Sequence, residues 1–197
     1  SVVYPAAGNI GGGGFLIARK PNNELVAIDY REVAPGNANK DMYLDKDGNA
    51  QLNLSQSGRL AAGVPGTIAG IFSTLPFAKL DFKLLIQPAI DVAKFGYVIT
   101  EREANGLNSN KNAFVKHNSH TPAFVKSSPW KVGDTLYQPE LAETLIRIRD
   151  HGAKGFYEGE TANLIVAEMK QGNGIISLED LKNYKAKMRE PLSFDYG

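Results

Sequence analysis

The chain has 197 residues, of which 43% are hydrophobic and 22% are charged, and this is enough apolar material for one packed domain. Its 22 basic and 21 acidic residues give a formal net charge of +1, so the composition has no basic excess and we expect no nucleic-acid partner. The absence of cysteine excludes disulfides, thiolate metal sites and a cysteine nucleophile.

Both ends of the sequence have features of a cut polypeptide. The chain starts at Ser1 without an initiator methionine or a charged leader followed by an apolar run. At the other end, residues 192–196 alternate like a strand and the chain stops directly afterwards. We therefore expect residues 1–197 to form a single partial domain of a longer protein.

Two short apolar segments in the first third predict a β-hairpin. Residues 15–18 and 25–28 are continuous apolar runs, and the Pro-Asn-Asn sequence at 21–23 between them has turn chemistry. Neither run alternates with polar residues, which indicates strands covered on both faces, as in a layered sandwich. Residues 36–63 are rich in Asn, Asp, Gly, Lys and Ser, and they predict an irregular surface loop.

The middle of the chain predicts helices joined by polar segments. One helix should start at Thr67, and a second should cover residues 84–95. Because Pro88 fits best in a first turn, we expect the regular part of the second helix to begin near Gln87. Residues 101–129 are polar and predict a short helix plus a loop.

The last third contains the clearest helix signals. Residues 139–150 begin with proline, have acidic residues in the first turn and are followed by Gly152, which is typical of a helix with both ends marked. Another helix is expected at about 160–170. Ser177 and Asp180 match a capping box for a short final helix.

The run Gly11, Gly12, Gly13 and Gly14 is the most unusual local feature. Glycines let a backbone approach a ligand or another strand closely. No Gly-Lys-Ser/Thr follows, so the run is not a phosphate-binding loop. Two interpretations remain open: a glycine cradle beside a site, or a tight backbone crossing with no ligand.

Arg31 stands at the end of the second predicted strand. The two-residue period of a strand places Asp29 and Arg31 on one face. A guanidinium in this position can bind a carboxylate through two parallel hydrogen bonds. The alternative is an internal ion pair with Asp29 or Glu32.

Other chemistry-bearing residues give weaker signals. His117 and His120 stand three apart in a polar segment without a third ligand in register, so we interpret them as solvated loop residues and expect no metal site. Every threonine is internal and lacks the free amine that would activate its hydroxyl.

Several sequence blocks, in this order along the chain, resemble the γ-glutamyltransferase (γ-glutamyltranspeptidase) family. They are residues 5–15 (PAAGNIGGGGF), 29–35 (DYREVAP), 63–67 (GVPGT), 85–90 (LIQPAI), 138–142 (QPELA), 155–157 (GFY), 179–181 (EDL) and 189–192 (REPL). The likeness extends over nearly the whole chain and corresponds to the N-terminal part of the family's large subunit.

The resemblance implies an α/β (α+β) fold: a partial αββα sandwich of the N-terminal nucleophile hydrolase type, here a helix-rich fragment with a β-hairpin. It implies a zymogen that cleaves itself into a large and a small subunit. A threonine at the start of the small subunit then attacks the γ-glutamyl bond of glutathione or another donor. Water, an amino acid or a dipeptide resolves the acyl-enzyme, and no cofactor takes part.

The resemblance also assigns roles to particular residues. Arg31 matches the arginine that holds the glutamyl α-carboxylate. The glycines at 11–14 and Glu32 are expected to support the site. No catalytic residue is expected in this chain, because the nucleophilic threonine lies downstream, in the small-subunit partner. The family suggests a periplasmic or cell-surface location.

Two alternatives use the same fold. One is a related acylase that acts on a cephalosporin or glutaryl side chain. The other is a non-catalytic homologue whose small subunit lacks the threonine.

Overall fold

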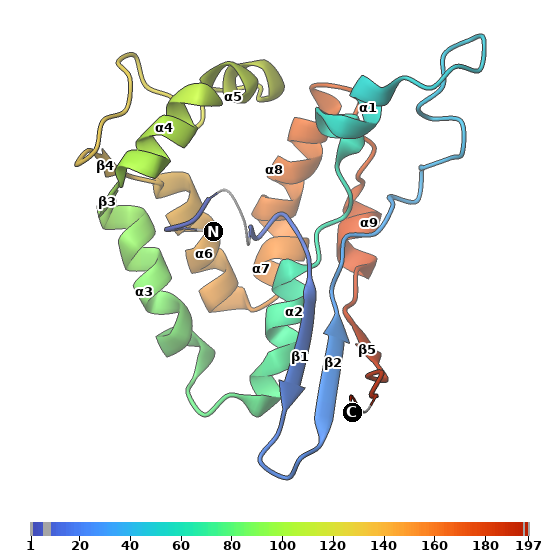
Figure 1. The fold of residues 1–197 in the computed structure, drawn as a ribbon, viewed down its shortest axis with the longest axis vertical. Helices are drawn as coiled ribbons and strands as arrows, with labels where there is room; N and C mark the ends of the chain where they lie inside the picture. The colour runs from blue at the N-terminus through green and yellow to red at the C-terminus, as the bar shows by residue number, and fades with distance from the viewer. Residues whose placement is uncertain (1, 6–8, 195, 197) are drawn as a thin grey trace.

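The computed structural model of the chain describes residues 2–5, 9–194 and 196, and helices dominate it (Figure 1). The helices are α1 (Leu52–Gln56), α2 (Thr67–Thr74), α3 (Phe82–Phe95), α4 (Glu101–Ser109), α5 (Lys111–His117), α6 (Pro139–His151), α7 (Lys154–Tyr157), α8 (Gly159–Lys170) and α9 (Leu178–Asn183). The strands are β1 (Phe15–Arg19), β2 (Leu25–Asp29), β3 (Tyr97–Val98), β4 (Thr135–Leu136) and β5 (Lys187–Arg189).

The predicted hairpin is confirmed, and a strand from the far end of the chain extends it. β1 and β2 pair antiparallel with Ile17 opposite Ala27, and β5 pairs antiparallel with the other edge of β2. The strand expected at 192–196 is wrong, since residues 192–194 and 196 have no strand pairing; Asp195 lies outside the described residues. The third strand comes earlier, at β5.

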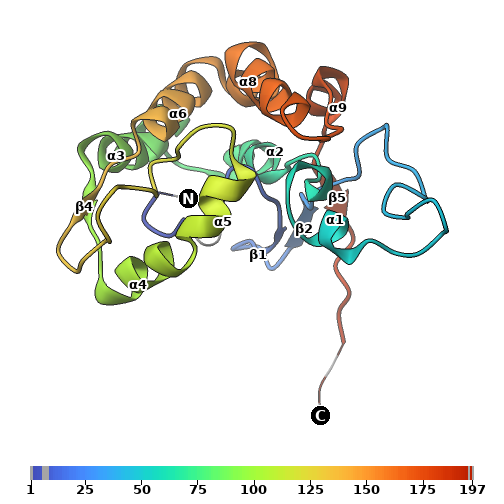
Figure 2. The ribbon, with the colours of Figure 1, turned by 90° about the horizontal axis from the view of Figure 1, so that it is seen from above.

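The two faces of this sheet differ in cover. Ile28 is 1% exposed and lies on the face that packs against α2, which stands between the sheet and the outer helices α6 and α8 (Figure 2). Phe15 and Ile17, on the opposite face, are 63% and 72% exposed. The three central residues of β2 are buried, as the expectation of covered strands requires, but β1 has one exposed face in the described part of the chain, so cover on both faces is wrong for β1 there.

Most of the helices share one apolar core. α3 packs along α6, and α6 continues into α7 and α8 through short connections. Buried side chains at the centre of this core include Ile68, Ile90, Ile148 and Leu181. A smaller cluster around α4 and the β3–β4 pair contains Ile99, Ala104, Leu107, Trp130 and Leu136.

Helix ends marked by local chemistry lie where the sequence predicts them. α6 begins at Pro139, and Gly152 follows its end with φ +65°. The Ser177 hydroxyl accepts a hydrogen bond from the Asp180 backbone N–H at 3.1 Å, while the Asp180 carboxylate accepts one from the Ser177 N–H at 2.8 Å. This is the reciprocal capping box that the spacing predicts.

The expected start of α3 near Gln87 is wrong. The helix begins at Phe82, where the Asp81 carboxylate accepts a hydrogen bond from the Lys83 N–H at 2.7 Å. Pro88 lies inside the helix and cannot donate to the Leu84 carbonyl. Leu84 is 65% exposed, so this turn of the helix is open to water, which can hydrogen-bond backbone groups that the proline leaves unpaired.

Three short helices are absent from the sequence prediction. The segment 101–129 contains two helices, α4 and α5, rather than one, and a capping box between Thr100 and Glu103 starts α4. The segment 36–63 is mostly irregular as expected but includes α1. α7 is a single turn between α6 and α8. Of the described residues, none belongs to a helix long and apolar enough to cross a membrane.

One carboxylate joins three segments that are distant in sequence. Glu168 of α8 accepts hydrogen bonds from Arg59 Nε at 3.0 Å, from the Ser119 N–H at 3.1 Å and from the Ser119 hydroxyl. The side chains of Arg59 and Glu168 are 15% and 25% exposed. Burial alone would raise the pKa of Glu168, but the hydrogen bonds from Ser119 and Arg59 outweigh it and hold the pKa below its usual value.

We expect Glu168→Gln to destabilise the fold at neutral pH. A hydrogen bond to a charged group contributes about 1.5–3 kcal/mol, and the amide keeps only part of this. Because the folded-state pKa of Glu168 is depressed, its stabilisation is complete above the ordinary carboxyl pKa and is lost as the pH falls through the lowered value. Denaturant unfolding at a series of pH values should show the gap between wild type and variant closing in acid.

Glu143→Gln on α6 is the matched control. The Glu143 side chain is exposed and makes no ion pair or hydrogen bond with any residue in the described ranges. Its removal should change stability by less than about 0.5 kcal/mol at every pH. Equal behaviour of the two variants would contradict the role assigned to Glu168.

Candidate functional site

Arg31 lies just beyond the end of β2, on the uncovered face of the sheet. Its guanidinium carbon stands 5.7 Å from the centre of the Phe15 ring, and Phe15 pairs with Asp29 across the hairpin. The Arg31 side chain is 62% exposed. The guanidinium therefore points to the side of the sheet that is open in the described part of the chain.

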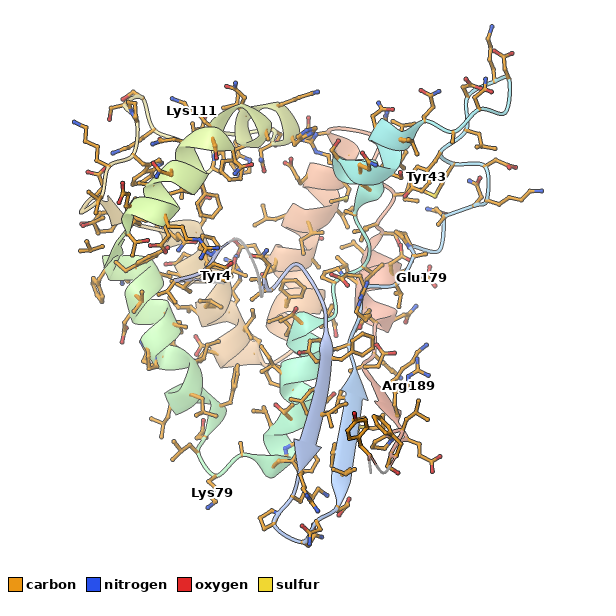
Figure 3. The ribbon with its side chains drawn as sticks, in the orientation of Figure 1. Tyr4, Tyr43, Lys79, Lys111, Glu179 and Arg189 are labelled. Atoms are coloured by element: carbon orange, nitrogen blue, oxygen red, sulfur yellow. The ribbon has the colours of Figure 1, made fainter. Side chains whose placement is uncertain are left out.

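Of the two ion pairs that the sequence offers as alternatives for Arg31, the one with Asp29 does not form and the one with Glu32 is long. Asp29 pairs with Arg189 of β5 instead, at 2.7 Å between its carboxylate and Nη2 (Figure 3 labels Arg189). Arg31 Nε lies 3.4 Å from Glu32 Oε2, which is a long contact between half-exposed groups. Most of the N–H donors of the fork thus remain free to bind a ligand.

Asp29 acts on the Arg31 backbone rather than on its side chain. Its Oδ1 accepts a hydrogen bond from the Arg31 N–H at 3.1 Å. The hydrogen bonds from Arg189, followed by that from the Arg31 backbone, hold the pKa of Asp29 below its usual value. Asp29 is consequently ionised at neutral pH, and it fixes the start of the turn that carries Arg31.

The glycine run packs directly against the segment that carries Arg31. The Gly14 carbonyl accepts a hydrogen bond from the Tyr30 N–H at 2.9 Å. A Cβ at Gly13 would lie 2.5 Å from the Tyr30 carbonyl oxygen and 2.8 Å from the Glu32 nitrogen. Gly13 therefore cannot carry a side chain, and the tight backbone crossing occurs at the candidate site.

The other three glycines of the run differ in how closely they pack against Tyr30 and Glu32. A Cβ at Gly12 would meet the Glu32 carboxylate at 3.5 Å, and one at Gly14 would meet the Tyr30 ring at 3.1 Å. Gly11 has no neighbour within 4 Å of such an atom. The contacts with Glu32 place its carboxylate over the run, but Gly11 takes no part in this packing.

A second glycine pair encloses Tyr30 from the side of α2. Gly66 immediately precedes α2 and Gly70 lies within it, and a Cβ at Gly70 would overlap the Tyr30 ring. The Gly12 carbonyl accepts hydrogen bonds from the N–H groups of Gly66 and Thr67 at 2.8 and 3.0 Å. The start of α2 thus holds the glycine run and the Arg31 segment together.

Three cavities bordered by described residues lie away from Arg31. Their volumes are about 480, 630 and 270 Å³. The first lies beside α4 and α5, the second is an apolar groove between α2, α3 and α6, and the third adjoins α1 and His117. Across the described ranges, no cluster of three or more His, Asp or Glu side chains is placed to hold a metal ion.

The match to a known protein family extends over the whole length of the chain. A model of the family described as gamma-glutamyltranspeptidase matches residues 1–197. The chain belongs to the gamma-glutamyltranspeptidase family. It is 38% identical over 199 aligned residues to the glutathione hydrolase proenzyme of Escherichia coli K12, and the match covers all of this chain and 34% of that protein.

Solved structures of the gamma-glutamyltranspeptidase family have the same fold. The Helicobacter pylori gamma-glutamyltranspeptidase superposes with a TM-score of 0.94 and 46% identity over 99% of this chain and 57% of its own. A cephalosporin acylase from Bacillus halodurans superposes with a TM-score of 0.80 at 22% identity, over 99% of this chain and 37% of its own, which shows a common fold only. The expected N-terminal nucleophile hydrolase fold is thus confirmed.

The chain spans about a third of the length of the curated gamma-glutamyltranspeptidase relatives it matches. The sequence signal for Arg31 came from its place after a predicted strand and from the DYREVAP block. No sequence signal linked Tyr184, which donates to the Arg31 carbonyl, or Arg189, which binds Asp29, to this site, because both lie more than a hundred residues away in the chain.

Proposed function

We propose that the whole protein containing this chain cleaves γ-glutamyl amides such as glutathione and transfers the glutamyl group to water, an amino acid or a dipeptide. The observation that carries the proposal is Arg31, an exposed and largely unpaired guanidinium at the open face of the sheet, whose backbone N–H is bound by Asp29. Membership of the gamma-glutamyltranspeptidase family supports it, as do relatives named glutathione hydrolase.

In this proposal Arg31 binds the α-carboxylate of the glutamyl group. Guanidinium and carboxylate are planar and match in geometry, so two parallel N–H···O bonds fix both position and orientation. The glycines at 12–14 let the backbone approach the Arg31 segment closely, and Glu32 lies between them and the guanidinium. These residues position the substrate, and none of them attacks it.

The nucleophile in this proposal is the first residue of a small subunit released from the same precursor. Its threonine hydroxyl, activated by its own α-amine, adds to the γ-carbonyl carbon, and the C–N bond breaks as the amine leaves with a proton. Water or an amino group then attacks the ester, which frees the threonine. A periplasmic or cell-surface location, as the family suggests, remains a prediction.

A chromogenic γ-glutamyl anilide tests this function. The whole protein should release the aniline, faster when a dipeptide acceptor is added, and the isolated 197-residue chain should release none. A panel with glutaryl and cephalosporin amides separates the acylase alternative. Turnover of those amides in preference to the γ-glutamyl anilide, or no turnover of any substrate, would contradict the proposal.

A further inference from the structure

The Arg31 backbone is bound on both sides by side chains, one from its own segment and one from a distant part of the chain. On the amide side, Asp29 Oδ1 accepts the Arg31 N–H at 3.1 Å while Arg189 holds Asp29 Oδ2. On the carbonyl side, the Tyr184 hydroxyl donates to the Arg31 carbonyl oxygen at 2.7 Å. Tyr184 follows directly after α9, 153 residues beyond Arg31 in sequence.

Tyr184 is itself held in place by a buried stack. Its ring lies parallel to the Tyr157 ring, at 5.8 Å between centroids and 10° between planes. The Tyr157 hydroxyl donates to the Pro65 carbonyl at 2.8 Å and accepts from the Ala69 N–H at 3.2 Å. Tyr157 and Tyr184 are 6% and 9% exposed, so the hydroxyl that reaches Arg31 comes from the core.

The Tyr184 hydroxyl is a permanent donor under neutral conditions. Burial, and then the negative charges of Asp29 and Glu32, raises the pKa of Tyr184. The phenol therefore stays protonated and keeps donating to the Arg31 carbonyl. The Arg31 side chain is 62% exposed, its ion-pair contact with Glu32 is long, and the centre of the Phe15 ring lies 5.7 Å from the guanidinium carbon. Because these contacts do little to orient the side chain, the backbone must.

We propose that Tyr184 is a positioning residue for substrate binding: together with Asp29 on the opposite side, it clamps the Arg31 backbone so that the guanidinium meets the glutamyl carboxylate in a fixed direction. This inference rests on the proposed γ-glutamyl activity. It connects the α7 and α9 layer of the core to the open face of the sheet. A bound substrate then loses little affinity to ordering the arginine.

Tyr184→Phe in the whole protein tests the clamp, because it keeps the stacked ring and removes only the hydroxyl. We expect KM for the γ-glutamyl anilide to rise about three- to tenfold while kcat stays within about twofold. Tyr43→Phe is the matched control, since the Tyr43 hydroxyl also donates to a carbonyl, that of Leu60 at 3.2 Å, beside α1 and away from β5 (Figure 3). Its KM should not change.

A second pair of variants separates positioning from a general loss of structure. In an Arg31→Met background, Tyr184→Phe should change KM by less than about twofold, because the hydroxyl acts through the arginine. Asp29→Ala should raise KM in the same way as Tyr184→Phe and should likewise add nothing to Arg31→Met.

The outcomes distinguish this inference from the proposed function. The proposed function holds if the unmodified protein turns over the anilide and Arg31→Met raises KM. If Tyr184→Phe then leaves KM unchanged, or adds its full effect to Arg31→Met, the positioning role of Tyr184 is wrong. An unmodified protein with no γ-glutamyl turnover would overturn both.

Discussion

Gly66→Ala is expected to lower the thermal unfolding midpoint of the whole protein strongly and to reduce its folded yield. A Cβ at Gly66 would overlap the Tyr30 carbonyl oxygen and the Tyr184 hydroxyl, and it would lie 2.6 Å from Tyr184 Cζ. These atoms belong to backbone and to a buried ring, so none can move aside cheaply. Overpacking of this kind costs about 1–3 kcal/mol, and sometimes more.

Gly106→Ala provides the control for Gly66→Ala. Gly106 lies inside α4, and no atom lies within 4 Å of the Cβ that alanine would add. Alanine is favoured over glycine in a helix interior by about 1 kcal/mol, so this variant should be as stable as the wild type or more stable. Equal losses of stability in the two variants would show that the glycine contacts at the start of α2 are not tight.

Local signals were enough to find the elements whose ends are marked by side-chain chemistry. A proline and a glycine mark α6, and Ser177 with Asp180 marks α9, because each signal works within one helical turn. The hairpin was equally accessible, since its two strands and its turn are adjacent in sequence. α3 shows the limit of such rules, because the sequence does not reveal that the turn of helix before Pro88 is exposed to solvent.

The elements that the sequence did not reveal depend on partners far away in the chain. β5 has only three residues and forms a strand because the edge of β2 is available to it. α1 and α7 are single turns whose own sequences carry no capping pair, and packing against neighbours decides them. Two of the exposed side chains of β1, Phe15 and Ile17, are apolar as a covered strand requires, which explains why the sequence indicated cover on both faces.

The candidate site likewise combines residues that the sequence could identify with contacts that it could not predict. Arg31 could be selected from its position after a strand and from the motif around it, and the glycine run could be read as a close crossing. The contacts that orient the Arg31 segment could not be predicted, because Tyr184 and Arg189 lie 153 and 158 residues beyond Arg31 and nothing in the sequence links them to it, although Arg189 belongs to the REPL block. A positioning contact of this type becomes visible only once the fold brings the segments together.

Arg31→Met is expected to raise KM for γ-glutamyl donors by about 10- to 150-fold with a much smaller change in kcat. Loss of charge-assisted hydrogen bonds costs about 1.5–3 kcal/mol, and each 1.4 kcal/mol corresponds to a factor of ten. Arg31→Lys keeps the charge without the planar guanidinium, so its KM should lie between that of the wild type and that of Arg31→Met. Initial-rate kinetics with the γ-glutamyl anilide give KM and kcat for the wild type and both variants.

A substrate that lacks the α-carboxylate makes the same test specific for the contact. The wild type should prefer the γ-glutamyl anilide strongly over the 4-aminobutyryl anilide, and Arg31→Met should lose most of this preference, because the variant no longer senses the carboxylate. Arg19→Met is the matched control: Arg19 is exposed on the same face of the sheet, on β1, and has no ion pair within the part of the chain that the structure describes. It should keep the wild-type preference. If Arg31→Met also kept it, Arg31 would be a structural residue, and the glutamyl carboxylate would bind elsewhere.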